Sequence, residues 1–265
     1  MTMTTTTLHA ATGGIEHRDD QPWLILLHGA GNNRTVWAHQ ARYFASRGWN
    51  VLSYDLPGHG QSEGPAPRTI QTHVEAVIAD LDERGVTRAA AVGHSMGALI
   101  ALQLAGERPQ LVSHLGLVGG GLALAVADAL LSASEHEPDL ARDAVVDWAF
   151  SSRSHIGGAE LPGSWLDGAG RTLIAREIAR HPDSFGADFA ACAAYDAGPQ
   201  AATQVTCPAA IISGSQDMMT RPALGRAAAE AIADATYTEI SGAGHMLMAE
   251  APTAVTKAMN ALLTR

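Results

Sequence analysis

Short apolar runs alternate with amphipathic runs along most of the chain. Each apolar run has the length of a buried strand, and the runs between them repeat apolar residues at helical spacing. Such alternation is typical of parallel strands joined by right-handed helical crossovers. The sequence therefore predicts an α/β fold with a doubly wound, mostly parallel sheet. The first predicted strands are residues 22–29, 50–58, 88–95 and 114–121, and the helices between and after them are Thr35 to Ser46, Thr69 to Arg84 and Met96 to Glu107.

The alternation stops after Gly121 and resumes at a strand over residues 208–214. The intervening segment looks helical and rich in loops. We therefore expect one core domain, the α/β sheet of residues 1–121 and 201–265, with residues 122–200 inserted between two strands as a helical cap. Because ligands bind at the carboxyl edge of an open α/β sheet, this cap is expected to cover the site. The remaining predicted elements are a helix at 222–234, a strand at 235–241, a helix at 252–263 and one or two weak edge strands within 4–17.

The pentapeptide Gly93-His94-Ser95-Met96-Gly97 lies between a predicted strand and a predicted helix. A serine on so sharp a turn presents its hydroxyl to the cleft, and side chains two residues before or after it would collide with neighbouring chain. This context favours Ser95 as a catalytic nucleophile over a chance match to the motif.

A serine nucleophile needs a base, and the base needs a carboxylate that orients it. Asp217 follows the strand at 208–214, and His245 follows the strand at 235–241. Both are therefore expected at the sheet edge where Ser95 lies, in the chain order Ser, Asp, His. The alternatives are a helix-capping role for Asp217 and a solvated loop position for His245. Asp128 is the first carboxylate after the rival strand at 114–121, while Asp55 is expected to brace its own turn by hydrogen bonds.

Acyl transfer also requires hydrogen-bond donors for the oxyanion. The backbone N–H of Met96, which follows the nucleophile, is the first candidate. The backbone N–H of Ala30, in the turn His28-Gly29-Ala30-Gly31, is the second. The nearby His28 and His59 are expected to be structural hydrogen-bond partners, and a tight turn without a catalytic part is the alternative for this loop.

Composition narrows the class of protein. The chain has 265 residues, of which 46% are hydrophobic and 17% charged, and its formal net charge is −10 with a single lysine, Lys257. Such a chain offers no basic patch for nucleic acid or for an anionic membrane. We find no metal-ligand spacing and no nucleotide-binding motif, so neither a metal nor another cofactor is expected. The absence of a secretion signal and of a 20-residue apolar span predicts a cytoplasmic protein, with Cys192 and Cys207 as free buried thiols and a single disulfide as the alternative.

Together these segments resemble the α/β-hydrolase superfamily over about residues 20–264. The resemblance implies the fold, the Ser95, Asp217 and His245 triad, and a place near small-ester carboxylesterases and enol-lactonases. Dehalogenases and epoxide hydrolases of this fold use an aspartate nucleophile, so Ser95 separates the chain from them, and Met246 stands where meta-cleavage C–C hydrolases usually carry an aromatic residue. The segments that carry the resemblance are HGAG with Trp37, then DLPGHGQS (55–62), GHSMG (93–97), GSQD (214–217) and GAGH (242–245).

Large apolar side chains of the cap are expected to shape the substrate pocket, although packing of the cap onto the sheet is the alternative for each of them. The favoured function is hydrolysis of a small-molecule carboxylic ester or lactone through an acyl-enzyme on Ser95. A C–C bond hydrolase or lyase with the same triad, and a small-molecule receptor with vestigial hydrolysis, are the alternatives. The expected pocket residues are Trp148, Phe150, Trp165, Tyr195 and Met246.

Overall fold

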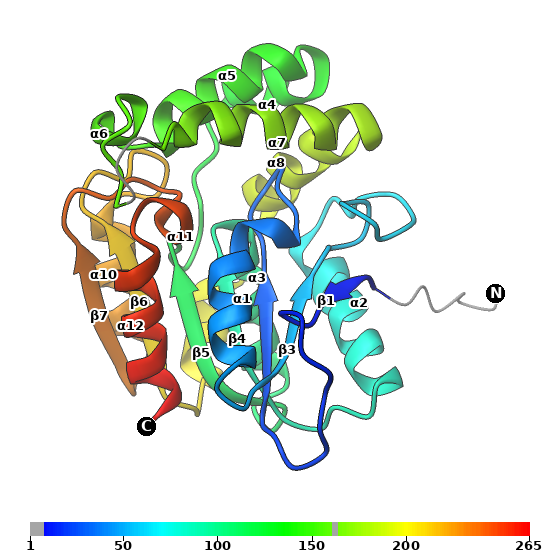
Figure 1. The fold of residues 1–265 in the computed structure, drawn as a ribbon. Coiled ribbons are helices and arrows are strands. Elements are labelled where there is room, and N and C mark those ends of the chain that lie inside the picture. The colour runs from blue at the N-terminus through cyan, green and yellow to red at the C-terminus, as the bar shows by residue number, and fades with distance from the viewer. Residues whose placement is uncertain (1–7, 161–163) are drawn as a thin grey trace.

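The computed structural model describes residues 8–160 and 164–265 and contains a twisted sheet of seven strands with helices on both faces (Figure 1). The strand order is β1-β3-β2-β4-β5-β6-β7, and only β1 runs antiparallel to its neighbour. The predicted doubly wound, mostly parallel sheet is therefore confirmed. The strands are β1 (Ala10–Ala11), β2 (Trp23–Leu27), β3 (Asn50–Tyr54), β4 (Ala89–His94), β5 (Val112–Val118), β6 (Ala209–Gly214) and β7 (Ala235–Ile240).

The central strands are mainly apolar because both of their faces are covered. In β2, Ile25 and Leu27 face a core shared with α2, α3 and α10, while Leu24 and Leu26 face a second core under α1 and α12. The core helices are α1 (Ala38–Ala45), preceded by the 3₁₀ turn η1 (Arg34–Trp37), α2 (Ile70–Glu83), α3 (Met96–Glu107), α9 (Gly198–Gln204), α10 (Pro222–Ala231), α11 (Leu247–Glu250) and α12 (Pro252–Leu263).

The segment between β5 and β6 forms a helical layer above the carboxyl ends of the strands (Figure 1). The predicted boundary at residue 200 falls within α9, which packs against α3 beside the sheet instead of joining that layer. We use "cap" for residues 122–197. Its helices are α4 (Asp128–His136), α5 (Pro138–Ala149), α6 (Ser152–His155), α7 (Leu166–Arg180) and α8 (Ser184–Ala194).

The amino-terminal edge of the sheet is short. Of the weak strands expected within residues 4–17, β1 pairs Ala10 and Ala11 with Tyr54 and Ser53 of β3. Residues 4–7 lie outside the described part of the chain. Just before β1, His9 lies beside the turn that follows β3, and its Nδ1 atom is 3.4 Å from Oδ2 of Asp55 in a polar network described below.

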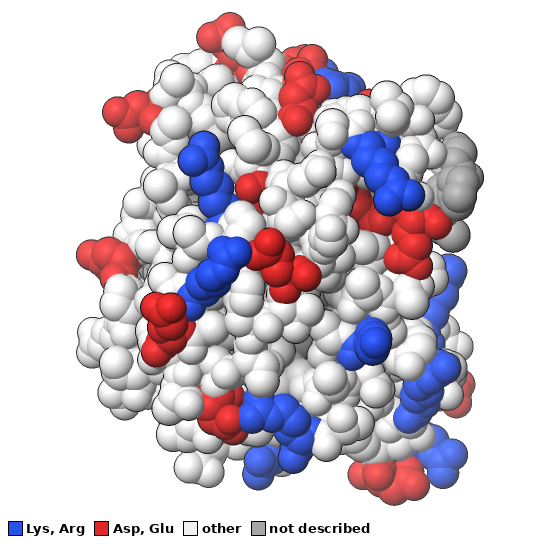
Figure 2. Space-filling model, turned by 90° about the vertical axis from the view of Figure 1, so that its left-hand side faces the viewer, with Lys and Arg blue, Asp and Glu red and all other residues white. Residues whose placement is uncertain are grey.

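Charged side chains are mixed on the face that Figure 2 presents, with Lys and Arg interspersed among Asp and Glu. In the described ranges, no helix combines the length and the apolar character required to cross a bilayer. Cys192 and Cys207 are both free and buried. Burial raises the pKa of both thiols, that of Cys207 to about 11, so neither is an activated thiolate.

Candidate active site

Ser95 lies on a sharp turn between β4 and α3. Its φ of 53° and ψ of −116° make it the one residue other than glycine with positive φ among those described. A Cβ on Gly93 would overlap the carbonyl of Gly97, and a Cβ on Gly97 would overlap the carbonyl of Leu27. The glycines on both sides are therefore required by the close approach of the backbone, as the motif predicts. Strain of this kind is concentrated at functional sites.

Asp217 and His245 come together beside this turn from the ends of β6 and β7. The Oδ2 atom of Asp217 lies 2.8 Å from Nδ1 of His245, and both side chains are buried. Because a carboxylate only accepts hydrogen bonds, Nδ1 is the donor in this contact, and in the neutral imidazole Nε2 then carries the lone pair. The other carboxylate oxygen accepts from the N–H groups of Met219 (2.9 Å) and Thr220 (2.7 Å). Asp217 thus braces its own turn and also orients an imidazole, whereas the alternative helix-capping role is not seen, because Arg221 is the N-cap of α10 and no side chain of the described residues caps that helix.

The loop that carries His245 is held by contacts on both sides. His245 donates its backbone N–H to the carbonyl of Ala149 in the cap (2.7 Å), and Nε2 of His94 lies 3.0 Å from the carbonyl of His245. Glu250 accepts from the N–H of Gly244 with one oxygen (3.0 Å) and from cap residues 151 and 154 with the other. Burial, together with His245, keeps the pKa of His94 well below its usual range, so His94 is a neutral donor to this loop.

The turn after β2 passes directly beside Ser95. A Cβ on Gly29 would lie 3.0 Å from Cβ of Ser95. Within the described ranges, the N–H groups of Ala30 and Met96 have no hydrogen-bond partner inside the protein. Free backbone donors on either side of a nucleophile are what an oxyanion requires.

The His28 side chain joins this turn to the turn after β3. Its Nε2 accepts from the N–H of Leu56 (3.1 Å), and its Nδ1 therefore donates to the carbonyl of Gly29 (2.9 Å). Burial, reinforced by the nearby His59, lowers the pKa of His28 to about 3. A neutral, fixed imidazole agrees with the structural role expected from the sequence.

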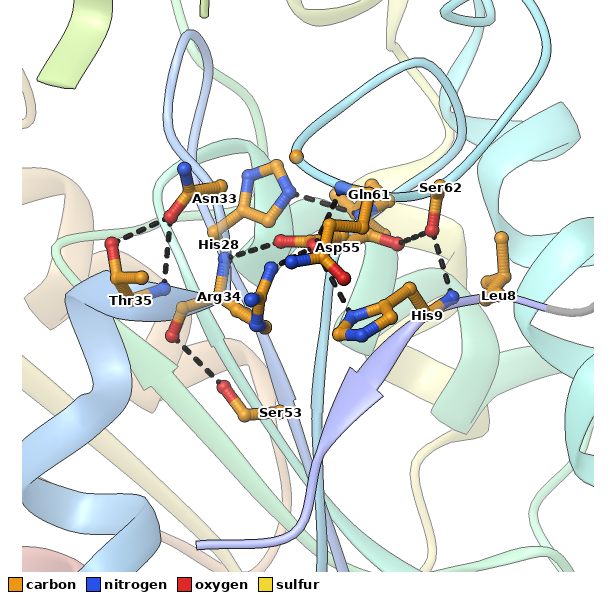
Figure 3. A network of polar contacts seen from close by, with 12 residues as sticks. Leu8, His9, His28, Asn33, Arg34, Thr35, Ser53, Asp55, Gln61 and Ser62 are labelled. Carbon is orange, nitrogen blue, oxygen red and sulfur yellow. Dashed lines mark hydrogen bonds and ion pairs between the residues drawn. The ribbon is translucent and has the colours of Figure 1, made fainter. Parts of the chain in front are cut away.

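Asp55 is the centre of the polar network in Figure 3, which joins β1, η1 and the turn after β3. Its carboxylate accepts from the backbone N–H of Arg34 (2.9 Å), from the Arg34 guanidinium and from the N–H of Gln61 (2.9 Å). A Cβ on Gly60, whose φ is +52°, would overlap this carboxylate. The predicted bracing of the turn by Asp55 is confirmed, and the same network reaches Arg34, at the end of the loop that follows β2.

Ser95 and His245 both line a cavity of about 70 Å³ between the sheet and the cap. The cavity wall is mainly aliphatic and aromatic. None of the described residues that line it is Lys, Arg, Asp or Glu, and within the described part of the chain no three His, Cys, Asp or Glu side chains are grouped as metal ligands. Prominent wall residues are Leu130, Val145, Val146, Phe150, Ile174 and Phe189.

Comparison with known proteins supplies the family. The sequence model of the Alpha/beta hydrolase family matches residues 24–258, which is most of the chain. The chain belongs to the alpha/beta hydrolase family. The strand order and the mostly parallel sheet agree with this membership.

Three relatives illustrate the range of this family. This alpha/beta hydrolase is 29% identical over 243 residues to "Putative carbamate hydrolase RutD" of Klebsiella pneumoniae (strain 342), covering 84% of each chain. It is 27% identical over 262 residues to the (E)-2-((N-methylformamido)methylene)succinate hydrolase of Acinetobacter baylyi, covering 94% of this chain and 92% of the relative. The solved structure of the enol-lactonase from Burkholderia xenovorans LB400 superposes with a TM-score of 0.88 at 27% identity, over 99% of this chain and 98% of that one.

The structure corrects three of the five expected pocket residues of this alpha/beta hydrolase. Phe150 and Met246 line the cavity as expected. Trp148 and Trp165 do not, because they lie at the surface with 44% and 65% of their area exposed. Tyr195 packs against the core, where its hydroxyl donates to Oε1 of Gln103 (2.7 Å). Helical register decides these positions, since α5 directs Val145, Val146 and Ala149 toward the cavity and Trp148 away from it.

Three buried carboxylates that contact the cap escaped the sequence interpretation: Glu177, Asp188 and Glu250, none more than 4% exposed. Asp188 and Glu177 join the cap to the turns after β2 and β3. Glu250, on α11, joins the cap to the loop of His245. The sequence did contain a signal for one of them, because Asp188 is the single charged residue in the mainly apolar run 184–195. A lone carboxylate in a buried helix is normally paired, although the sequence does not reveal its partner.

Proposed function

We propose that this alpha/beta hydrolase cleaves small, uncharged carboxylic esters or lactones through an acyl-enzyme on Ser95. The observation that carries the proposal is the fixed tautomer of His245. Asp217 holds Nδ1–H at 2.8 Å, which leaves the Nε2 lone pair for a proton from the nucleophile lining the same cavity.

In the first step, Oγ of Ser95 attacks the ester carbonyl while His245 Nε2 takes its proton. The carbonyl oxygen becomes an oxyanion next to the N–H groups of Ala30 and Met96. The tetrahedral intermediate then expels the alcohol, which receives the proton held by His245. Water repeats the sequence on the acyl-enzyme and releases the acid.

The first experiment is a series of p-nitrophenyl acetate, butyrate and octanoate esters. The cavity of about 70 Å³ is far smaller than the ~300–1,000 Å³ of sites that enclose drug-sized ligands. We therefore expect kcat/KM for acetate or butyrate to exceed that for octanoate at least about 10-fold, since pocket size alone discriminates by ~10–200-fold. Release of p-nitrophenol is the readout. A preference for octanoate would contradict the narrow acyl site.

A second prediction concerns substrate charge. The name of the Acinetobacter relative contains succinate, whereas no cationic side chain is among the described residues that line this cavity. Because burying a carboxylate without a partner costs several kcal/mol, p-nitrophenyl hemisuccinate should have a kcat/KM at least ~100-fold below that of the butyrate ester. The two acyl groups have similar length, so they form a matched pair. Equal rates would contradict an uncharged substrate class.

The alternatives make different predictions in the same assay. A C–C hydrolase or lyase would leave the esters intact and turn over a vinylogous diketone, which is followed by its absorbance. A receptor would bind a small molecule tightly with turnover slower than about one per minute, against ~1–10³ per second for most enzymes. A lactone and an aryl carbamate in the panel would separate ester chemistry from that named for the Klebsiella relative.

A further inference from the structure

We call residues 28–33, the loop between β2 and η1, the oxyanion turn, because it carries the proposed oxyanion donor Ala30. Carboxylates of the cap accept hydrogen bonds from this turn. Asp188, on α8, is fully buried, and its Oδ2 atom accepts from the N–H of Gly31 (2.8 Å). The same oxygen lies 2.9 Å from Nε2 of His59, in the turn after β3. Glu177, on α7, accepts from Nδ2 of Asn33 (2.7 Å) farther along the same loop. The cap therefore contacts this loop through charged hydrogen bonds in addition to apolar packing.

These bonds fix the peptide groups on both sides of Ala30. On one side, the carbonyl of Gly29 accepts from Nδ1 of His28 (2.9 Å) and from the N–H of Asn32 (3.2 Å). On the other side, the carbonyl of Ala30 accepts from Nδ2 of Asn32 (2.9 Å), and the N–H of Gly31 donates to Asp188. Of these restraints, the hydrogen bond to Asp188 is the one supplied by the cap. Gly31 has a φ of +66°, and because glycine changes its backbone conformation easily, this bond is needed to hold the turn in place.

Asp188 and His59 form a fully buried ion pair. The ring nitrogens of His59 face two acceptors, Oδ2 of Asp188 and the carbonyl of Pro57 (3.1 Å), and only the doubly protonated imidazole satisfies both. Burial opposes both charges, yet each partner stabilises the other, so the pKa of His59 is raised and that of Asp188 is lowered. The pair thus presents a fixed, charged acceptor to Gly31, and charge-assisted hydrogen bonds are the stronger kind.

We propose that Asp188 is a positioning residue for the oxyanion hole, through which seating of the cap helix α8 sets the direction of the Ala30 N–H. The inference rests on the proposed function, because it assigns to Ala30 the role of oxyanion donor. It adds a requirement beyond the catalytic residues themselves. The Ala30 N–H points toward the oxyanion only while α8 is seated on the core. The cap then encloses the substrate and also completes the catalytic geometry.

The test compares two substitutions of similar volume, Asp188→Asn and Asp188→Leu. Asparagine keeps an oxygen that accepts from Gly31, so kcat for p-nitrophenyl butyrate should stay within about 5-fold of wild type. Leucine removes the acceptor, so kcat should fall about 10- to 100-fold, less than the ~10²–10³ that follows complete loss of an oxyanion donor. KM should change less than 3-fold in both, since ground-state binding does not use this donor.

An oxyanion-specific ligand separates positioning from a general loss of structure. A propyl trifluoromethyl ketone adds to Ser95 and places its oxyanion in the hole, whereas the corresponding trifluoromethyl carbinol does not. Asp188→Leu should weaken the ketone in proportion to kcat and leave carbinol affinity unchanged. Arg171→Gln is the cap control, because the Arg171 guanidinium pairs with Asp143 and Asp147 within the cap, and it should behave as wild type.

A second variant tests the same peptide group, between Ala30 and Gly31, in case Asp188→Leu does not fold. Asn32→Ala removes the donor to the Ala30 carbonyl, and it should also lower kcat and ketone affinity together. Wild-type kcat in a folded Asp188→Leu or Asn32→Ala variant, or a change confined to KM, would overturn the positioning role. Such a result would leave the proposed function intact, which fails only if wild type neither hydrolyses the esters nor binds the ketone through Ser95.

Discussion

Replacing Ser95 by alanine is expected to lower kcat for p-nitrophenyl butyrate at least about 10⁴-fold, the scale seen when a serine nucleophile is removed. The substitution deletes one oxygen and leaves the backbone of the turn as it is, so the folded structure and its thermal midpoint should persist. No acyl-enzyme can then form, and the initial burst of p-nitrophenol that accompanies acylation should disappear. Stopped-flow absorbance measures the burst and the steady rate together.

Ser213→Ala is the matched control for this substitution. Ser213 is a buried serine on β6 that does not line the cavity, and its alanine variant should retain wild-type turnover. Mass spectrometry of the wild type after rapid quenching should find the butyryl group on the peptide that contains Ser95. Turnover near the wild-type rate in a folded Ser95→Ala protein would refute the assignment of the nucleophile.

Replacing Asp217 by asparagine is expected to lower kcat by about 10³- to 10⁴-fold, and the structure shows why so small a change should matter. One carboxylate oxygen accepts from the N–H groups of Met219 and Thr220, so the oxygen of the new amide will stay there. Its NH₂ group then faces Nδ1 of His245 and can only donate to it. The imidazole must move its proton to Nε2, where a proton acceptor is needed.

This prediction has a control and a structural readout. Asp128→Asn alters the exposed carboxylate at the start of α4, the rival acid suggested by the chain order, and should leave kcat unchanged. The imidazole ¹⁵N shifts of His245 should show Nδ1 protonated in wild type and Nε2 protonated in Asp217→Asn. Full activity of the Asp217 variant, or loss of activity in the Asp128 variant, would move the search for the acid to the end of β5.

The cap is connected to both halves of the candidate site by buried polar groups. On one side, Asp188 and Glu177 hold the loop after β2 through Gly31 and Asn33. On the other, Glu250 and the carbonyl of Ala149 hold the loop of His245. Because a buried charge that loses its partner is strongly unfavourable, the cap is expected to move as a unit or to remain seated rather than to detach gradually.

The sequence by itself determined the fold and the chain order of the candidate triad. Unbroken apolar runs such as Trp23–Leu27 are readable because both faces of a central parallel strand are buried. Gly93 and Gly97 are readable because the turn around Ser95 leaves no room for a Cβ. Asp217 and His245 follow their strands directly, so the geometry of a parallel sheet was sufficient to bring them to one edge.

Only the tertiary structure decided which side chains form the pocket and which carboxylates join the cap to the core. Trp148, Trp165 and Tyr195 were expected to line the cavity on account of their size, yet the rotation of the cap helices placed aliphatic residues there instead. Asp188 and Gly31 are separated by 157 residues along the chain and meet through a single hydrogen bond. Local sequence patterns reflect burial and turn geometry, whereas contacts of this kind depend on how the cap packs against the sheet.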